Sequence, residues 1–400
     1  METVQAQTDK KYLYVFIFIG MGLLITTTGF GRMAYGVILP FMQTDLGFTT
    51  TESGMLGTCL FLGYLATVGL SGIMTGKIGA KNTLLIGNVA VLIGLIDLVI
   101  VKSYFLTVIG VILLGAGSAL VFTPLMSLAA SSFSSKRGMV MGCLMSGAGI
   151  GMLLSGLIVS VIVSIFPGEA WRYAWFVFFI ITLAMFVLTM LYLKDVSTQQ
   201  RVSASPNFKK ETWRSKPLYL LGMVYFVFGL IYLIPNLYQT SYLVDVGASK
   251  SLASSIYSFA GFISIFGAPL WGWMADRLGL KRSLVTILLL SAIGNVIPVF
   301  QTNPIAFILS SFIWGMSLGG TLVLIQIQVT KLVKQQYTAL AISFISVFYG
   351  IGQMIGPGFS GWLIDFFSTY NAGYIFSVCG FLICAVLSLF LPSKYNSVTT

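Results

Sequence analysis

A single arginine interrupts a long apolar stretch near the start of the chain. Arg32 lies in the segment GFGRMAYGVILP, with Thr28 four residues before it and Tyr35 three residues after it. On a helix, these spacings place the three side chains on one face. The guanidinium group is always charged, and its planar fork of donors matches a carboxylate. Thr28, Arg32 and Tyr35 are therefore candidate ligands for an organic anion. A structural pairing of Arg32, or a position at the outer membrane interface, stays open as the alternative.

A second polar stripe runs through a later apolar segment, at alternating spacings of four and three residues. Its members are Tyr225, Gly229, Tyr232, Asn236 and Gln239. A stripe with this period lies on one side of a helix, and in a helical bundle it faces inward. Aromatic hydroxyls and an amide can orient a ligand, so we expect Tyr225, Tyr232 and Asn236 to bind substrate. For each tyrosine, a role as a packing aromatic is the alternative.

Four more residues are candidates because they are polar side chains within apolar runs. Trp314, Tyr349 and Gln353 lie near the middle of their runs, and we expect them to line a cavity. Asp97 is the one acid inside an apolar run, in LIGLIDLVIVK, and the chain has no histidine. Asp97 is a candidate for proton coupling, with an interfacial acid as the alternative. Coupling does not require it, because a substrate carboxylate can itself carry the proton.

The elements that must position these residues are apolar runs long enough to cross a bilayer, roughly 20 residues each. There are twelve, centred near positions 25, 62, 92, 116, 150, 182, 228, 262, 292, 317, 350 and 382. The connections are short except Lys194–Lys216, which is polar, charged and rich in serine. The sequence predicts an all-α membrane protein with a six-helix bundle over 1–193, a cytoplasmic linker over 194–216 and a second six-helix bundle over 217–400.

Composition agrees with a membrane protein and excludes several other classes. Hydrophobic residues make up 57% of the chain, charged residues 8%, and the mean hydropathy is +0.95. No polar exterior could cover that much apolar surface in water. The net charge of +11 is scattered over many short turns, so we expect no nucleic-acid partner. The four cysteines lie in apolar runs without metal-type spacing, and neither a metal site nor a disulfide is expected.

The distribution of the cations predicts the topology. An even number of spans puts both termini on one side. Assigning them to the cytoplasm places most of the 22 lysines and arginines inside. Lys102, Arg172 and Lys250 are then outside, and Arg32 is within a helix. Compact loops and the lack of an Asn-x-Ser/Thr sequence favour a bacterial inner membrane.

The chain also repeats itself at an offset near 200 residues. GWMADRLGLKR at Gly272–Arg282 has a partial copy, GIMTGKIGAKN, that starts at Gly72, with Gly76 in the place of Asp276. GAGIGMLLSG at Gly147–Gly156 and GQMIGPGFSG at Gly352–Gly361 share the pattern GxxxGxxxSG. Small residues at i and i+4 let helices approach closely in lipid, so we interpret these glycines as packing positions. Under an offset of 200, Arg32 corresponds to Tyr232.

Twelve helices in two sets of six, a charged central linker and the GWMADRLGLKR turn resemble the major facilitator superfamily and its loop signature. The resemblance implies alternating access, in which two six-helix halves rock about a central site. It also implies that Asp276 and Arg277 act as a conformational lock on the cytoplasmic side, with a solvated positive-inside turn as the alternative. The N-terminal copy lacks the acid, the arginine typical of the fourth helix is missing, and the fifth helix lacks the Gly-Pro pair of proton antiporters.

These residues favour a secondary active transporter of a small organic anion similar to a monocarboxylate, driven by proton coupling. The alternative is an exporter of amphipathic or drug-like compounds, against which the positive charge of Arg32 counts. A membrane enzyme or sensor has no support, because the sequence contains no histidine and no nucleotide motif such as a P-loop. We expect no cofactor, and partners limited to a small anionic substrate and the lipid bilayer, with the protein as a monomer.

Overall fold

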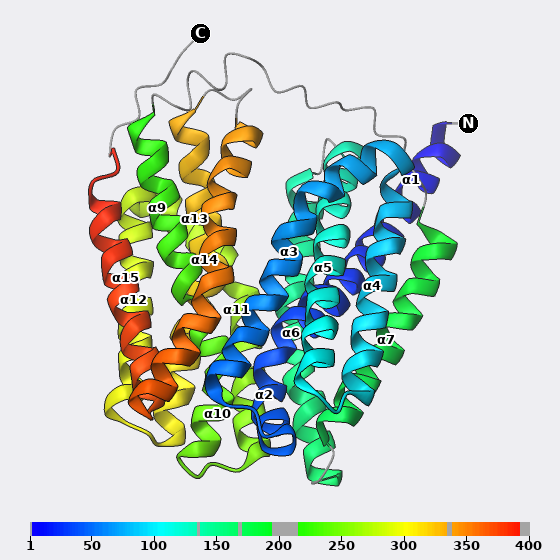
Figure 1. The fold of residues 1–400 in the computed structure, drawn as a ribbon. Helices are drawn as coiled ribbons and strands as arrows, with labels where there is room; N and C mark the ends of the chain where they lie inside the picture. Colours follow the sequence, from blue (N-terminus) through cyan, green and yellow to red (C-terminus); the bar gives the residue numbers. More distant parts are fainter. Residues whose placement is uncertain (1, 134–136, 167–169, 194–214, 334–337, 393–400) are drawn as a thin grey trace. The chain divides into compact units, whose positions relative to one another are not determined.

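The computed structural model describes residues 2–133, 137–166, 170–193, 215–333 and 338–392, and Figure 1 shows their arrangement. Within these ranges the chain is helical and forms no strand. The first predicted span is one long rod in three parts, α1 (Glu2–Leu24), η1 (Ile25–Met33) and α2 (Ala34–Leu46). It is followed by α3 (Thr50–Ile78), α4 (Ala80–Ile100), α5 (Tyr104–Ser132), α6 (Arg137–Ile165) and α7 (Ala170–Tyr192).

The seventh predicted span is also divided, into α9 (Lys216–Ile231) and α10 (Leu233–Asp245). The remaining helices are α11 (Lys250–Leu278), α12 (Leu280–Phe300), α13 (Pro304–Leu332), α14 (Thr338–Phe367) and α15 (Tyr370–Leu389). Each of the twelve predicted spans therefore corresponds to a helix or to a rod of consecutive helices. The prediction of an all-α membrane fold with twelve spans is confirmed.

The lengths of these helices match a bilayer. Among the described residues, eleven segments are long and apolar enough to cross a membrane, with mean hydropathies of 1.4 to 2.5. The first of them, Tyr12–Leu46, has 35 residues, more than a perpendicular crossing of the hydrocarbon core needs. α14 has 30 residues and stands at the place of the eleventh predicted span.

The internal repeat is visible in the helix boundaries. α3, α4 and α5 begin and end 200 residues before α11, α12 and α13. The turns repeat as well, because Gly47 and Gly247 both have positive φ angles, of 69° and 91°, and so do Gly79 and Gly279, at 86° and 87°. Glycine adopts this conformation at no steric cost, which explains why all four turns carry it.

The chain divides into two compact units. Unit 1 comprises Met1–Gly47 and Cys59–Arg201, and unit 2 comprises Phe48–Thr58 and Val202–Thr400. The first turns of α3 thus belong to unit 2, where the backbone N–H of Thr51 donates to Asp365 Oδ2 at 2.5 Å. The predicted linker falls almost entirely outside the described residues, and the bundle boundaries at 193 and 217 stay a prediction.

The glycine motifs are packing positions, as their spacing indicates. In unit 1, a Cβ on Gly147 of α6 would lie 2.6 Å from the carbonyl oxygen of Met21 in α1, and Gly151 faces Gly29 of η1. In unit 2, Gly352 and Gly356 of α14 face the backbone of α9 in the same manner. The first helix of each unit is therefore packed backbone to backbone against the fifth.

Candidate functional site

Arg32 lies in a π-helical segment. η1 covers Ile25–Met33, and the backbone N–H of Ala34 bonds to the carbonyl oxygen of Gly29, five residues earlier. Two threonines at its start are tied to the preceding turn, because Thr26 Oγ1 donates to the Gly22 carbonyl oxygen at 3.0 Å and Thr27 Oγ1 to that of Leu23 at 2.7 Å. π-helical turns within α-helices are rare and occur frequently at functional sites.

The Arg32 guanidinium group is held by two aromatic rings of α3. Its central carbon lies 4.3 Å from the ring centroid of Tyr64 and 5.0 Å from that of Phe61. The side chain is half-buried, and its buried Nε has no hydrogen-bond partner. No carboxylate of the described residues forms an ion pair with Arg32. A half-buried cation with aromatic neighbours and no counter-ion can bind an anion.

The two other predicted residues of this helix have different surroundings. Thr28 is half-buried, whereas Tyr35 is 1% exposed and is already in α2. Because η1 is wound with i→i+5 bonds, Thr28 and Arg32 lie on a π-helical turn rather than on a regular α-helix, and the shared face with Tyr35 stays a prediction. The structure therefore keeps Arg32 as the principal candidate of unit 1.

Unit 2 breaks its first helix at the position equivalent to Arg32. Tyr232 separates α9 from α10, and Pro235, which has no N–H, follows three residues later. The carbonyl oxygen of Ile231 lacks that helical donor and accepts from Ser377 Oγ at 3.4 Å. The carbonyl oxygen of Tyr232 accepts from Trp314 Nε1 at 3.1 Å. Side chains of α13 and α15 thus supply hydrogen-bond donors to the two carbonyl oxygens at the break.

Four of the predicted residues surround Tyr232. Gln353 Nε2 of α14 donates to the Tyr232 hydroxyl, and Trp314 of α13 bonds to its backbone. Tyr349 stacks on Tyr225 with the ring centroids 4.3 Å apart and lies 5.5 Å from the ring of Tyr232. Three of these side chains are 2–3% exposed. The structure therefore brings Tyr225, Tyr232, Trp314, Tyr349 and Gln353 together.

Asn236 and Gln239 have partners that the sequence did not indicate. Asn236 Nδ2 donates to the Tyr257 hydroxyl of α11 at 2.8 Å, and three residues later Gln239 Nε2 donates to Ser311 Oγ of α13 at 2.5 Å. Tyr257 and Ser311 resemble the many other polar residues of these spans, so no feature of spacing singles them out. The other end of the Asn236 amide and the hydroxyl of Thr240 have no partner in the described part of the chain.

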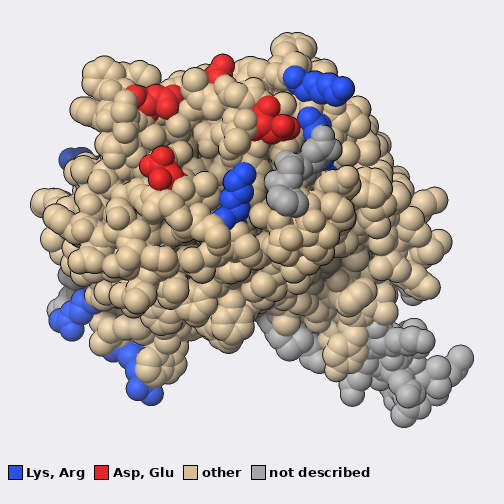
Figure 2. Space-filling model, turned by 90° about the horizontal axis from the view of Figure 1, so that it is seen from below, with Lys and Arg blue, Asp and Glu red and all other residues tan. Residues whose placement is uncertain are grey.

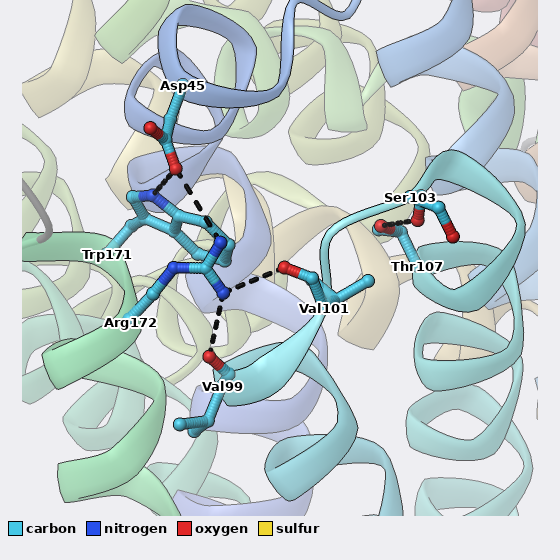
Figure 3. Close-up of polar contacts among 7 residues, drawn as sticks. All are labelled: Asp45, Val99, Val101, Ser103, Thr107, Trp171 and Arg172. Atoms are coloured by element: carbon cyan, nitrogen blue, oxygen red, sulfur yellow. Dashed lines mark hydrogen bonds and ion pairs between the residues drawn. The ribbon is translucent and has the colours of Figure 1, made fainter.

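A charged cluster ties together α2, α4 and α7 in unit 1, as Figure 3 shows. Asp45 Oδ2 accepts from Trp171 Nε1 at 3.0 Å and lies 3.7 Å from a guanidinium nitrogen of Arg172. Arg172 also donates to the carbonyl oxygens of Val99 and Val101, at 2.9 and 2.8 Å. The sequence predicted only an outer location for Arg172. Through these contacts, Arg172 of α7 joins the C-terminal end of α4 to α2.

The remaining predicted residues take no part in the contacts described above. Asp97 of α4 is half-buried, next to Gly110 of α5, and its Oδ2 has no hydrogen-bond partner among the described residues. Asp276 and Arg277 are exposed at the end of α11, where the Arg277 guanidinium carbon lies 4.2 Å from the ring centroid of Trp273. Figure 2 shows a surface that is mostly uncharged, with a few acidic and basic side chains.

Comparison with known proteins gives the family. A family model described as "Uncharacterised MFS-type transporter YbfB" matches residues 24–389. The chain belongs to this family. The match covers every helix that carries a candidate residue of this MFS-type transporter.

Named relatives of this MFS-type transporter are more distant. Monocarboxylate transporter 12-B of Danio rerio is 25% identical over 363 residues, which are 80% of this chain and 74% of that protein. The hexuronate transporter of Bacillus subtilis is 24% identical over 402 residues, which are 92% and 91% of the two chains. The names of both relatives specify carboxylates.

Solved structures share the fold of the transporter at low sequence identity. A D-xylose-proton symporter has a TM-score of 0.80 and 15% identity, with 97% of this chain and 100% of the other covered. The nucleoside transporter NupG has a TM-score of 0.76 and 14% identity, with 95% and 98% covered. These similarities confirm the major facilitator fold that the loop signature indicates.

Proposed function

We propose that this MFS-type transporter is a secondary active transporter of a small organic anion similar to a monocarboxylate. One observation carries the proposal: the Arg32 guanidinium is half-buried within an apolar helix, and no carboxylate of the described residues pairs with it. A charge in this position is costly unless a partner compensates it. A carboxylate substrate is such a partner, and the named relatives transport monocarboxylates and hexuronates.

Alternating access with both termini in the cytoplasm completes the proposal. Asp276 and Arg277 are at the end of α11 where the loop signature lies, and their exposed side chains are accessible for a contact that forms and breaks during transport. If they act as a lock, Asp276→Asn lowers the transport rate and leaves the dissociation constant for substrate unchanged. An equal loss of binding would exclude that role.

Proton coupling has one candidate group in the protein and one in the substrate. Asp97 is half-buried with an unpartnered oxygen, which is compatible with a site that is protonated and deprotonated during transport. A substrate carboxylate can also carry the proton. Asp97→Asn abolishes uptake driven by a pH gradient if Asp97 is the coupling group, and leaves it intact if the substrate carries the proton.

An exporter of amphipathic compounds is the second candidate function. The aromatic cluster of unit 2 favours it, because the rings of Tyr225, Phe228, Tyr232 and Tyr349 stack on one another with centroids 4.3 to 6.5 Å apart. Aromatic rings of this kind can bind apolar or cationic ligands in addition to packing against one another. Arg32 opposes this function for cations.

Thermal stabilisation of the purified protein separates the two functions. Small carboxylates, sulfonates and lipophilic cations are compared on the wild type, on Arg32→Gln and on Lys102→Gln, which removes an exposed charge outside the candidate residues. The anion function predicts that carboxylates raise the melting temperature of the wild type and of Lys102→Gln but not of Arg32→Gln. Stabilisation of all three proteins by cations, with none by carboxylates, would support the exporter instead.

A further inference from the structure

Two neighbouring polar groups on α10 have no hydrogen-bond partner in the described part of unit 2. They are one end of the Asn236 side-chain amide and the hydroxyl of Thr240, on side chains that are 1% and 0% exposed. A buried polar group without a partner destabilises the fold, and native proteins retain few of them. Other buried side chains, such as Asn88 and Ser283, also lack a partner, but among the described residues only Asn236 and Thr240 are two such side chains four residues apart on one helix. We interpret the pair as a position for a ligand.

The geometry of α10 makes these two groups one site. Asn236 and Thr240 are four residues apart on a regular α-helix, so their side chains are neighbours on one face. The amide is fixed in place because its other end donates to the Tyr257 hydroxyl at 2.8 Å. The bond from Gln239 Nε2 to Ser311 Oγ, at 2.5 Å, also holds the turn of α10 between Asn236 and Thr240. The unpartnered groups are therefore presented by a rigid support.

The equivalent positions of unit 1 show that the fold does not need this pair. Under the offset of 200 residues, Asn236 corresponds to Gly36 and Thr240 to Pro40. Neither of those has a side-chain donor or acceptor. The polar pair is therefore specific to unit 2, whereas the cation is specific to unit 1.

We propose that Asn236 and Thr240 form a subsite for the hydroxyl groups of the substrate, which is then a hydroxylated carboxylate rather than an unsubstituted alkyl carboxylate. This inference rests on the proposed transport of organic anions. A ligand hydroxyl both donates and accepts, so it satisfies an amide end and a threonine hydroxyl together. An alkyl chain leaves both groups unpaired, and a site built to bond a hydroxyl rejects the analogue that lacks it.

Matched carboxylates test the subsite. Propionate, lactate and glycerate have the same three-carbon skeleton with zero, one and two hydroxyl groups, and glucuronate extends the series to a sugar acid. Dissociation constants are measured for the purified wild type by calorimetry. The subsite predicts that glycerate binds more tightly than propionate, by on the order of ten-fold for each hydroxyl that is bonded. Equal affinities along the whole series would overturn the inference.

Isosteric variants locate the effect. Thr240→Val and Asn236→Leu remove the polar groups and keep the volume, and Thr321→Val is the control, since that buried hydroxyl bonds within its own helix to the Ser317 carbonyl oxygen. We expect Thr240→Val and Asn236→Leu each to lower the affinity for glycerate at least about ten-fold more than the affinity for propionate. An unchanged ratio of the two affinities in both variants would mean that the groups bond only to water, which overturns the subsite.

The same measurements distinguish failure of the subsite from failure of the anion function. If no carboxylate binds the wild type, the proposed function fails, and glycerol and xylitol are then measured as neutral polyols. Polyol binding that Thr240→Val weakens would support the hydroxyl subsite without the anion. If neither carboxylates nor polyols bind, both proposals are contradicted.

Discussion

The two units solve the same structural problem with different chemistry. Each breaks or rewinds its first membrane span at a position 200 residues from the other, at Arg32 in η1 and at Tyr232 between α9 and α10. At that position unit 1 presents a cation stacked on aromatic rings, with no ion pair to any described residue. Unit 2 presents a neutral network, in which Trp314 and Ser377 bond to the carbonyl oxygens of the break and Gln353 bonds to the Tyr232 hydroxyl.

This difference indicates that the repeat determines the backbone structure common to both units, and that individual side chains determine which ligand groups each unit can bind. Helix boundaries, glycine turns and close contacts are shared between the units. The side chains at the break are not. We infer a division between the units, in which Arg32 of unit 1 is the candidate for charge recognition and the polar side chains around the break of unit 2 are candidates for hydrogen bonding. The four predictions below test this division, from the largest expected effect to the smallest.

Removal of the cation has the largest expected effect. Arg32→Gln loses a charge-assisted bond of about 1.5–3 kcal/mol, which corresponds to a loss of carboxylate affinity of roughly ten-fold to a hundred-fold. Tyr232→Phe, at the equivalent position, removes a neutral hydroxyl and weakens binding less, by about ten-fold at most. Calorimetric dissociation constants of the two variants compare them directly. Equal losses would break the proposed division between the units.

Crowding the contact between η1 and α6 has the next largest effect. A side chain on Gly151 meets the backbone of Gly29 and Ile25, so Gly151→Leu destabilises unit 1 by about 1–3 kcal/mol. Gly142 lies on the same helix with open space around it, and Gly142→Leu is the control. Thermal unfolding in detergent checks both variants. If the two melt alike, η1 is not held by backbone contact with α6.

The ends of the second helical parts differ in their polar contacts, although both carry an aspartate, Asp45 and Asp245. Asp45 of unit 1 bonds to Trp171 and pairs with Arg172, whereas in unit 2 the Tyr242 hydroxyl bonds to Asn371 Oδ1 and to the Pro298 carbonyl oxygen. Asp45→Asn costs about 1 kcal/mol at low salt and less at high salt, because this partly exposed ion pair is screened. Tyr242→Phe costs about 1–2 kcal/mol at either salt concentration. Melting temperatures of both variants at two salt concentrations measure this difference. An identical salt dependence of the two variants would contradict it.

Loss of an aromatic neighbour of Arg32 has the smallest expected effect. Tyr64→Leu removes a cation–π contact worth about 0.5–1 kcal/mol at a partly exposed site, so carboxylate affinity falls by roughly two-fold to five-fold. The melting temperature without ligand should change little. A loss as large as that of Arg32→Gln would mean that the ring itself binds substrate, which would sharpen the role of unit 1 beyond its charge.

Most of the architecture could be predicted from the sequence, because bilayer thickness fixes helix length and glycine marks the turns. The twelve spans and the offset of 200 residues follow from apolar runs and from the GWMADRLGLKR turn. The family resemblance was likewise present in that turn. Tyr225, Tyr232 and Asn236 were found because their spacing forms one stripe on a helix, and Trp314, Tyr349 and Gln353 because they lie near the middle of their apolar runs.

Other features depend on tertiary contacts that no local pattern contains. The π-helical winding of η1, which holds Thr28 and Arg32, accompanies its backbone contact with Gly151, more than 100 residues away, and no local pattern predicts it. The pairing of Asp45 with Arg172, and the assignment of the first turns of α3 to unit 2, join distant segments in the same way. Asn236 was a candidate, but its support by Tyr257 and the unpartnered Thr240 hydroxyl required coordinates.

Uptake of a labelled carboxylate into proteoliposomes tests the central role of Arg32 most directly. Wild type, Arg32→Gln and Lys102→Gln are reconstituted at equal density, and uptake of lactate or glycerate is followed with and without a pH gradient. We expect uptake by the wild type and by Lys102→Gln, stimulated by inward proton movement. At substrate concentrations below the wild-type dissociation constant, uptake by Arg32→Gln should be roughly ten-fold to a hundred-fold lower. Undiminished carboxylate uptake by Arg32→Gln would contradict the role of Arg32 in anion recognition.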